Sequence, residues 1–165
     1  MALILRGSCR CGAVGFTCES HTPQPFMLCY CSICRKTAGG GGYAINLGAD
    51  MATLKVEDPD RAIGVFRAEL RDHDGRCEVS SGQRNFCTLC ATARGLFEPN
   101  WSELVHPSAA SSVSERPVPP SRVHMMLRFK PDWVQPHIDP DDQSFDEYPD
   151  QSLEDWHKSR GLWID

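Results

Sequence analysis

Seven of the nine cysteines lie in three tight clusters whose spacing suits metal coordination. The clusters are Cys9-x-Cys11, Cys29-x-Cys31-x-x-Cys34 and Cys87-x-x-Cys90. Sulfurs two or three residues apart can reach the same zinc ion, which binds thiolates at about 2.3 Å. Small residues beside each cluster allow the tight backbone turns that such ligands need. The clusters therefore predict a zinc protein, because isolated structural cysteines would not be grouped in this way.

The number of clustered thiolates indicates two different sites. Four thiolates complete the tetrahedral shell of zinc and make a structural site, whereas three leave one position open, as in catalytic sites. The simplest division assigns Cys9, Cys11, Cys87 and Cys90 to the structural zinc, and Cys29, Cys31 and Cys34 to the open, catalytic zinc. In the alternative, an outside ligand such as a histidine closes the second site as well. Spacing alone does not choose between the two.

Charge and hydropathy restrict the partners and the setting of the chain. The net charge is −5 and no basic run is longer than Arg35-Lys36, which argues against nucleic acid as the main partner. The apolar run from Ala2 to Leu5 is too short for a signal peptide, and no stretch approaches the ~20 apolar residues of a membrane span. We therefore expect a cytoplasmic protein without a membrane partner. In that reducing setting, clustered cysteines bind metal rather than form disulfides.

Short segments punctuated by glycine must hold these clusters in place. Apolar residues alternate over residues 13–18, which is typical of a half-buried strand. Further strands are expected over residues 26–30, 43–47, 53–56, 62–66, 76–80, 93–97 and 123–129. One short helix is expected over residues 32–38, ending at the glycine run 39–42, and another over residues 152–160 with Ser152 as its N-cap. The two isolated cysteines, Cys18 and Cys77, are expected in the core.

These segments predict an all-β fold with a single domain of short antiparallel sheets, tied together by zinc-binding turns. Residues 1–130 would form the zinc-binding β domain. Within it, residues 106–122 are rich in proline and serine and are expected to form an exposed loop. Residues 131–165 would form an extended, acidic and proline-rich C-terminal tail that packs on the same domain and ends in the short helix.

Three strings carry a family resemblance: Gly7-Ser-Cys-Arg-Cys-Gly-Ala-Val14, Cys29-Tyr-Cys-Ser-Ile-Cys-Arg-Lys36 and Phe86-Cys-Thr-Leu-Cys90. In this order they resemble the signature of the glutathione-dependent formaldehyde-activating enzyme (GFA) family, which includes the centromere protein V domain. The stretch from Tyr148 to His157 is similar to the tail of many members. The resemblance implies a β-tent fold and the same division into four and three zinc ligands. Two departures are Ala91, where the family usually has glycine, and the segment from Val105 to Ala110.

The resemblance implies a carbon–sulfur lyase that joins formaldehyde and glutathione into S-hydroxymethylglutathione. A zinc ion with three thiolates is a weak Lewis acid and favours a fourth sulfur over the generation of hydroxide. A glutathione-like thiol held there as a thiolate could attack the carbonyl carbon of a small aldehyde. Arg35 and Lys36 could pair with the carboxylates of such a ligand, although both could equally be solvated charges.

Other functions remain open at this point. A non-catalytic, zinc-stabilised binding module would carry the same cysteines, and a redox sensor would oxidise the triplet reversibly and release zinc. Residues 39–42 could admit a ligand close to the backbone, but a helix stop and turn is the simpler interpretation. His73 and His157 are candidates for a proton relay, although each is more simply a surface or tail residue.

Overall fold

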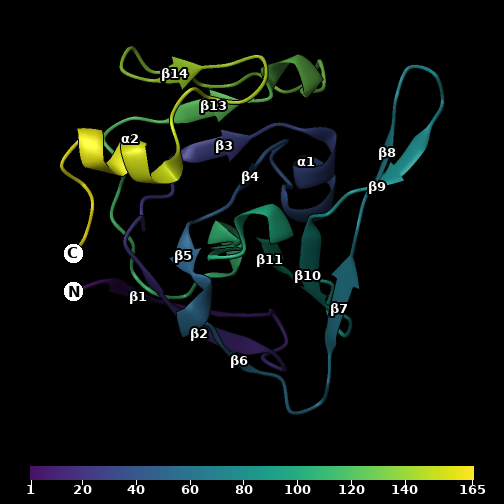
Figure 1. Ribbon diagram of the computed structural model, residues 1–165, viewed down its shortest axis with the longest axis vertical. Coiled ribbons are helices and arrows are strands. Elements are labelled where there is room, and N and C mark those ends of the chain that lie inside the picture. The colour runs from purple at the N-terminus through teal and green to yellow at the C-terminus, as the bar shows by residue number, and fades with distance from the viewer.

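The computed structural model describes residues 1–165 and consists mainly of short strands in four small sheets (Figure 1). The strands are β1 (Leu3–Ser8), β2 (Gly15–Ser20), β3 (Met27–Cys29), β4 (Ala44–Ile45), β5 (Ala49–Asp50), β6 (Lys55–Glu57), β7 (Ile63–Phe66), β8 (Glu69–Arg71), β9 (Cys77–Val79), β10 (Gln83–Cys87), β11 (Ala93–Phe97), β12 (Leu104–Pro107), β13 (Val123–Met125) and β14 (Gln143–Ser144). The α-helices are α1 (Ser32–Ala38) and α2 (Leu153–Ser159), and the 3₁₀ helices are Met51–Thr53, Pro99–Trp101, Ala109–Ser111 and Leu127–Phe129. None of these helices is long and apolar enough to cross a bilayer. The expected all-β class is confirmed.

Three of the four sheets are antiparallel, as expected. β1, β2 and β6 form one sheet, β5, β12, β11, β10 and β7 form the second in that order, and β8 and β9 form a separate hairpin. The fourth sheet has the order β14-β13-β3-β4 and is mixed, because β13 runs parallel to both β3 and β14. A parallel pair needs a long connection, and here the five-stranded sheet and the β8–β9 hairpin lie in the chain between β3 and β13.

The main core lies between the sheet of β1 and β2 and the neighbouring strands β5 and β12. It contains Leu5, Phe16, Cys18, Leu47, Ala49, Val105 and Ala109. The alternation expected for residues 13–18 is confirmed, since Phe16 and Cys18 point inward on β2. Cys18 is buried as expected. Cys77 is exposed on β9, so its prediction as a core residue was wrong. Its hairpin packs on no other sheet, and that absence of neighbours is not visible in the local sequence.

The segment expected as an exposed loop over residues 106–122 is only partly one. Its beginning continues β12, and His106 and Ser108 are buried there. The imidazole Nδ1 of His106 lies 3.1 Å from the carbonyl oxygen of Leu47, which satisfies its polarity inside the core. Similarly, the strand expected over residues 123–129 ends at Met125, and a left-handed residue, Met126, turns the chain into a 3₁₀ helix.

The C-terminal segment packs along β3 and β13 (Figure 1). Ser152 caps α2 by accepting a hydrogen bond from the Asp155 N–H at 3.0 Å, which confirms the expected helix and its cap. Trp156 is 1% exposed and stacks on Phe26 with their ring centroids 3.6 Å apart. Burial of an aromatic side chain of this size is among the largest single contributions to packing. The segment is therefore held by a core of its own.

Candidate metal centres and the cavity beside them

The structure brings Cys9, Cys11, Cys87 and Cys90 together although the two pairs are far apart in the chain. All four sulfurs lie within 4.8 Å of one another. The Cys9 and Cys11 sulfurs are 3.5 Å apart, and the Cys11 and Cys87 sulfurs are 3.8 Å apart. Zinc bound tetrahedrally to thiolates at about 2.3 Å places neighbouring sulfurs about 3.8 Å apart. The donor set and its spacing therefore fit a zinc ion.

Two tight turns produce this arrangement. In the first, Gly12 has φ of 80° and its N–H donates to the Cys9 carbonyl at 3.1 Å. In the second, Ala91 has φ of 60° and its N–H donates to the Cys87 carbonyl at 2.8 Å. An L-residue enters this left-handed region only at an energetic cost. Ala91, which stands where the family usually has glycine, thus keeps the turn but carries backbone strain.

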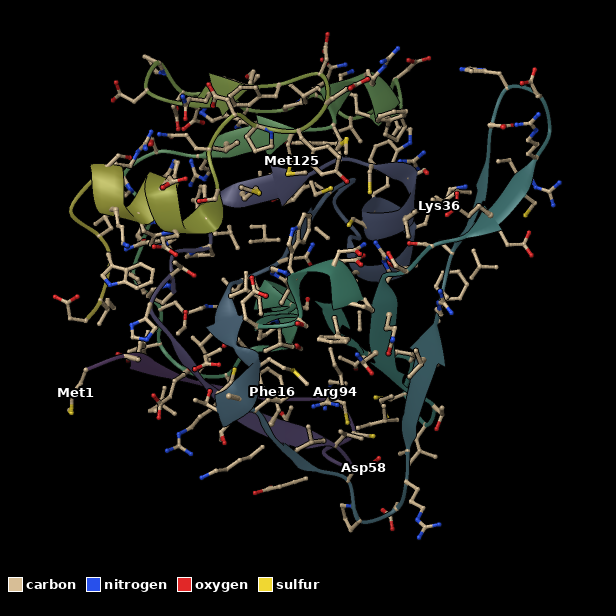
Figure 2. All side chains as sticks on the ribbon, viewed as in Figure 1. Met1, Phe16, Lys36, Asp58, Arg94 and Met125 are labelled. Atoms are coloured by element: carbon tan, nitrogen blue, oxygen red, sulfur yellow. The ribbon has the colours of Figure 1, made fainter.

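A buried cation lies beside the four-cysteine group. Arg94 on β11 is 6% exposed, and its Nη2 donates to the Gly15 carbonyl at 3.2 Å. Its guanidinium carbon lies 5.4 Å from the ring centroid of Phe16 (Figure 2). Burial lowers the pKa of Arg94, whereas the nearby Cys9, Asp58 and Cys87 raise it. Four thiolates around a divalent ion leave a net negative charge, which this guanidinium offsets.

Cys29, Cys31 and Cys34 form the second group, with their sulfurs also within 4.8 Å of one another. Cys29 ends β3, and Cys31 caps α1 by accepting a hydrogen bond from the Cys34 N–H at 3.3 Å. No histidine or carboxylate oxygen joins these three sulfurs. The group therefore offers three ligands to a metal, and the alternative with an outside histidine finds no support in the geometry.

The close approach of these sulfurs gives the three thiols very different pKa values. Hydrogen bonds from the Cys29 and Cys34 thiols lower the pKa of Cys31 to about 2. The same contacts with Cys31 and Cys34, followed by burial, raise the pKa of Cys29 far above its usual range. Three thiols this close cannot all ionise unless a cation is shared among them. The group is thus suited to a metal ion that displaces the remaining protons.

A buried chain of three side chains fixes the turn between Cys29 and Cys31. The Tyr30 hydroxyl lies 3.0 Å from Nδ1 of His124, and Nε2 of His124 lies 3.2 Å from the Asp142 carboxylate. The carboxylate also accepts the backbone N–H of Arg122 at 2.6 Å. Burial alone would raise the pKa of Asp142, but these hydrogen bonds together lower it. The cysteine turn is thereby anchored to residues more than ninety positions later in the chain.

A cavity of about 280 Å³ opens beside the three-cysteine group. It is lined by Cys34, Thr37 and Ala38 from α1, Arg84, Asn85 and Phe86 from β10, Ala93, Gly95 and Leu96 from β11, and Asn46, Phe66, Ala91 and Ser108. Two donors face the Cys34 sulfur: Asn46 Nδ2 at 3.7 Å and Arg84 Nη2 at 3.9 Å. The second terminal nitrogen of Arg84, Nη1, is buried without a hydrogen-bond partner. The cavity thus places positive charge next to the open group.

Arg35 and Lys36 lie on α1 and line a second depression, of about 350 Å³. It shares Thr37, Ala38, Ala93 and Ser108 with the first cavity, so the two are adjacent. Lys36 is exposed on the outer side of α1 (Figure 2). The segment from 105 to 110, where the sequence departs from the family pattern, contributes Ser108 and Ala110 to the lining of this second depression.

The glycine run after α1 serves mainly to turn the chain. A side chain at Gly42, where φ is 91°, would lie 2.3 Å from Val134. Gly40 in contrast has open space around it and lines the second depression. The simpler interpretation of the run as a helix stop is therefore supported.

Neither candidate histidine joins the cavity. His73 is exposed in the β8–β9 hairpin loop. His157 is fully buried on α2, where its Nε2 accepts the Gln24 N–H at 3.2 Å. Sequence reasoning missed Asn46 and Arg84. Arg84 could have been noticed as the only cation on the strand that leads to Cys87, whereas nothing local distinguishes Asn46.

The tail also reaches the three-cysteine group. The Glu147 carbonyl accepts a hydrogen bond from the Met126 N–H at 2.9 Å, beside the packing of Met125 and Met126 against the cysteines. Partial burial raises the pKa of the next residue, Tyr148, and the three cysteines raise it further. Its side chain nevertheless remains 68% exposed. Tyr148 therefore lies at the edge of the site and in contact with solvent.

Taken from its geometry alone, the molecule is an all-β protein with one closed four-cysteine group and one open three-cysteine group beside a cavity. Residues 4–106 match the family model described as glutathione-dependent formaldehyde-activating enzyme. A protein of Halomonas elongata, named “Putative glutathione-dependent formaldehyde-activating enzyme”, is 51% identical over 160 residues, covering 97% of this chain and 98% of the relative. The chain belongs to the glutathione-dependent formaldehyde-activating enzyme family. This confirms the resemblance, and with it the expectation of a carbon–sulfur lyase-type enzyme.

A crystal structure of a Rhodobacter sphaeroides protein is also similar, with 21% identity and a TM-score of 0.49. The match covers 68% of this chain and 91% of that one. At this level of likeness it adds nothing to the assignment of the family.

Proposed function

We propose that the chain binds two zinc ions and adds a glutathione-like thiol to formaldehyde or another small aldehyde at the three-cysteine site. The cavity beside the open group is the observation that carries this proposal, because a closed structural site would need none. Zinc at Cys29, Cys31 and Cys34 would hold the substrate sulfur as a thiolate at neutral pH. The four-cysteine group would hold the structural zinc.

Residues of the cavity supply the other requirements of the reaction. As the thiolate attacks, a carbon–sulfur bond forms, the carbonyl π electrons move to oxygen, and a proton from solvent completes the hydroxyl group. The thiol proton has already left to solvent, so the addition is balanced. The free Nη1 of Arg84 can donate a hydrogen bond to the oxygen while it carries negative charge. Asn46, which faces the same sulfur, adds a second donor.

The second depression suits a thiol with the size and charge of glutathione. Glutathione carries two carboxylates, and Arg35 and Lys36 provide two cations in a depression adjacent to the cavity. Arg35 Nε is buried without a hydrogen-bond partner, which leaves a donor available to a bound anion. A small apolar thiol would leave these groups unused.

Native mass spectrometry of protein purified without added metal tests the proposal. We expect two zinc ions per chain and one retained glutathione, which the Cys31→Ser variant loses together with one zinc. The double variant Arg35→Ala/Lys36→Ala should keep both zinc ions and bind glutathione at least about tenfold more weakly, since it lacks two charge-assisted contacts. Lys55→Ala is the matched control, because Lys55 is exposed on β6 and lines neither cavity. Two zinc ions without thiol binding would favour the non-catalytic binding module instead.

Catalysis needs a separate measurement, because formaldehyde and glutathione also combine spontaneously. The rate of adduct formation with enzyme should exceed the spontaneous rate. Arg84→Met should lower kcat by about tenfold to a hundredfold while glutathione binding persists, since it removes one donor to the developing oxyanion. Arg84→Lys should restore part of the loss. If no variant alters a rate that equals the spontaneous one, the protein binds the thiol without accelerating its reaction.

A further inference from the structure

The β8–β9 hairpin stands apart from the rest of the molecule. Its two strands form a separate sheet, and every residue in both is exposed (Figure 1). Leu70 and Val79 are 44% and 50% exposed, and Val65 and Phe66 at its base are 55% and 44% exposed. An isolated two-stranded hairpin is marginally stable in water unless further strands or a packing face support it. The hairpin therefore presents both free backbone groups and apolar surface.

The hydrogen bonds inside the hairpin define which backbone groups remain free. The Ser80 N–H donates to the Ala68 carbonyl at 2.8 Å, and the Asp72 N–H donates to the Arg76 carbonyl at 3.1 Å. Bonded and non-bonded pairs alternate along an antiparallel ladder. Residues 68, 70 and 72 thus use their backbone groups within the hairpin. Glu69 and Arg71 turn theirs to the outer edge of β8, where no strand pairs with them.

The side chains on this edge are complementary to themselves. β8 reads Glu69-Leu70-Arg71, so an antiparallel copy related by a two-fold axis at Leu70 places each Glu69 opposite an Arg71. The residues brought opposite at these two positions are those with free N–H and C=O groups, and they would exchange both hydrogen bonds. Leu70 would face Leu70 of the second copy with Cα atoms about 4.5 Å apart. Backbone, charge and apolar surface therefore agree on one register.

The other edge of the hairpin does not offer such a match. On β9 the corresponding two-fold axis passes through Glu78 and would place two glutamates directly opposite each other. Like charges at facing positions are destabilising. Because the β8 edge is complementary to itself, the partner that fits it is the same strand of a second copy, related by a two-fold axis. We propose that the outer edge of β8 pairs antiparallel with β8 of a second copy of this chain, making a four-stranded sheet across a dimer.

Charge substitutions and sedimentation equilibrium of the zinc-loaded full chain test this pairing. The wild-type mass should rise from one chain towards two with concentration. Glu69→Arg and Arg71→Glu should each weaken the dimer at least about tenfold, because each makes two facing pairs repulsive. An equimolar mixture of the two variants should recover the wild-type affinity as a heterodimer, since every facing pair is again opposite in charge. Glu78→Gln is the matched control on the other edge and should leave the affinity unchanged.

Each other outcome overturns the proposal. A wild type that stays monomeric at every concentration excludes the dimer. A dimer that both charge variants retain uses another surface, and a dimer that Glu78→Gln strengthens uses the β9 edge. Circular dichroism and zinc content of every variant establish that the rest of the fold is intact, which the exposure of these side chains leads us to expect. Glutathione binding measured on the same samples keeps this result separate from the proposed function.

Discussion

Replacing Ala91 with glycine should stabilise the protein by relieving strain at the turn formed by Cys87, Cys90 and Ala91. Ala91 has φ of 60°, a conformation that costs an L-residue about 1–2 kcal/mol. Glycine avoids that cost but gains about 0.4–1 kcal/mol of freedom in the unfolded chain. The expected net gain for Ala91→Gly is about 0.5–1 kcal/mol. In a chain of this length, that corresponds to a rise in Tm of about 1–4 °C.

Thermal and urea unfolding at a fixed concentration of free zinc measure this effect. Gly12→Ala is the reverse experiment, because φ there is 80° and a Cβ would meet no atom within 4 Å. It should lose about 0.5–1 kcal/mol, because the backbone strain of alanine exceeds what its less flexible unfolded chain gains. Ala93→Gly is the matched control in the adjacent strand and should destabilise, since glycine weakens a strand. An Ala91→Gly variant that is unchanged or less stable at full zinc occupancy would refute the strain at this turn.

Four substitutions examine the candidate metal sites and the packing of the tail. Cys87→Ser should unfold the domain, as circular dichroism would show, whereas Cys31→Ser should lose one zinc and stay folded; equal unfolding of both would contradict the division into structural and open sites. Asp142→Asn should cost about 1–3 kcal/mol at pH 7 in urea unfolding, because both carboxylate oxygens have hydrogen-bond partners and an amide offers only one acceptor oxygen. Since folding lowers the pKa of Asp142, its contribution is present above the ordinary value of about 3.9 and is lost as the pH falls through the folded value, so the difference from wild type should shrink below about pH 4. Trp156→Ala should cost about 3–5 kcal/mol, measured in the same way, by opening a cavity against Phe26; a loss below 1 kcal/mol would show that the tail helix does not contribute to the core.

The parts of the structure that follow from short-range pattern could be predicted from the sequence. The close spacing of Cys29, Cys31 and Cys34 predicts that their sulfurs meet where β3 leads into α1. Ser152 is likewise close enough to Asp155 to form the cap seen. The pairing of distant cysteine clusters was also predictable, since seven thiolates divide most simply into four and three.

What could not be predicted depends on contacts between distant segments. β13 lies parallel to β3 because Val123 pairs with Met27, and no local signal shows that register. From the local sequence, His106 is expected in a loop. In the structure it is buried, with its Nδ1 3.1 Å from the carbonyl oxygen of Leu47. Conversely, Cys77 looks like a small core residue until its hairpin is found to lack neighbours. Burial is set by what a segment meets, which hydrophobicity alone does not define.

The chain from Tyr30 through His124 to Asp142 also has a consequence for the order of events during synthesis. A ribosome releases the sulfurs of Cys29, Cys31 and Cys34 within the first quarter of the polypeptide, yet the residues that fix their turn emerge only after most of it has been made. The four-cysteine group, in contrast, is complete as soon as Cys90 has emerged. Maturation of the nascent protein is therefore ordered: the proposed structural centre could take up a metal while translation continues, and the three-cysteine group acquires its final shape near the end of translation.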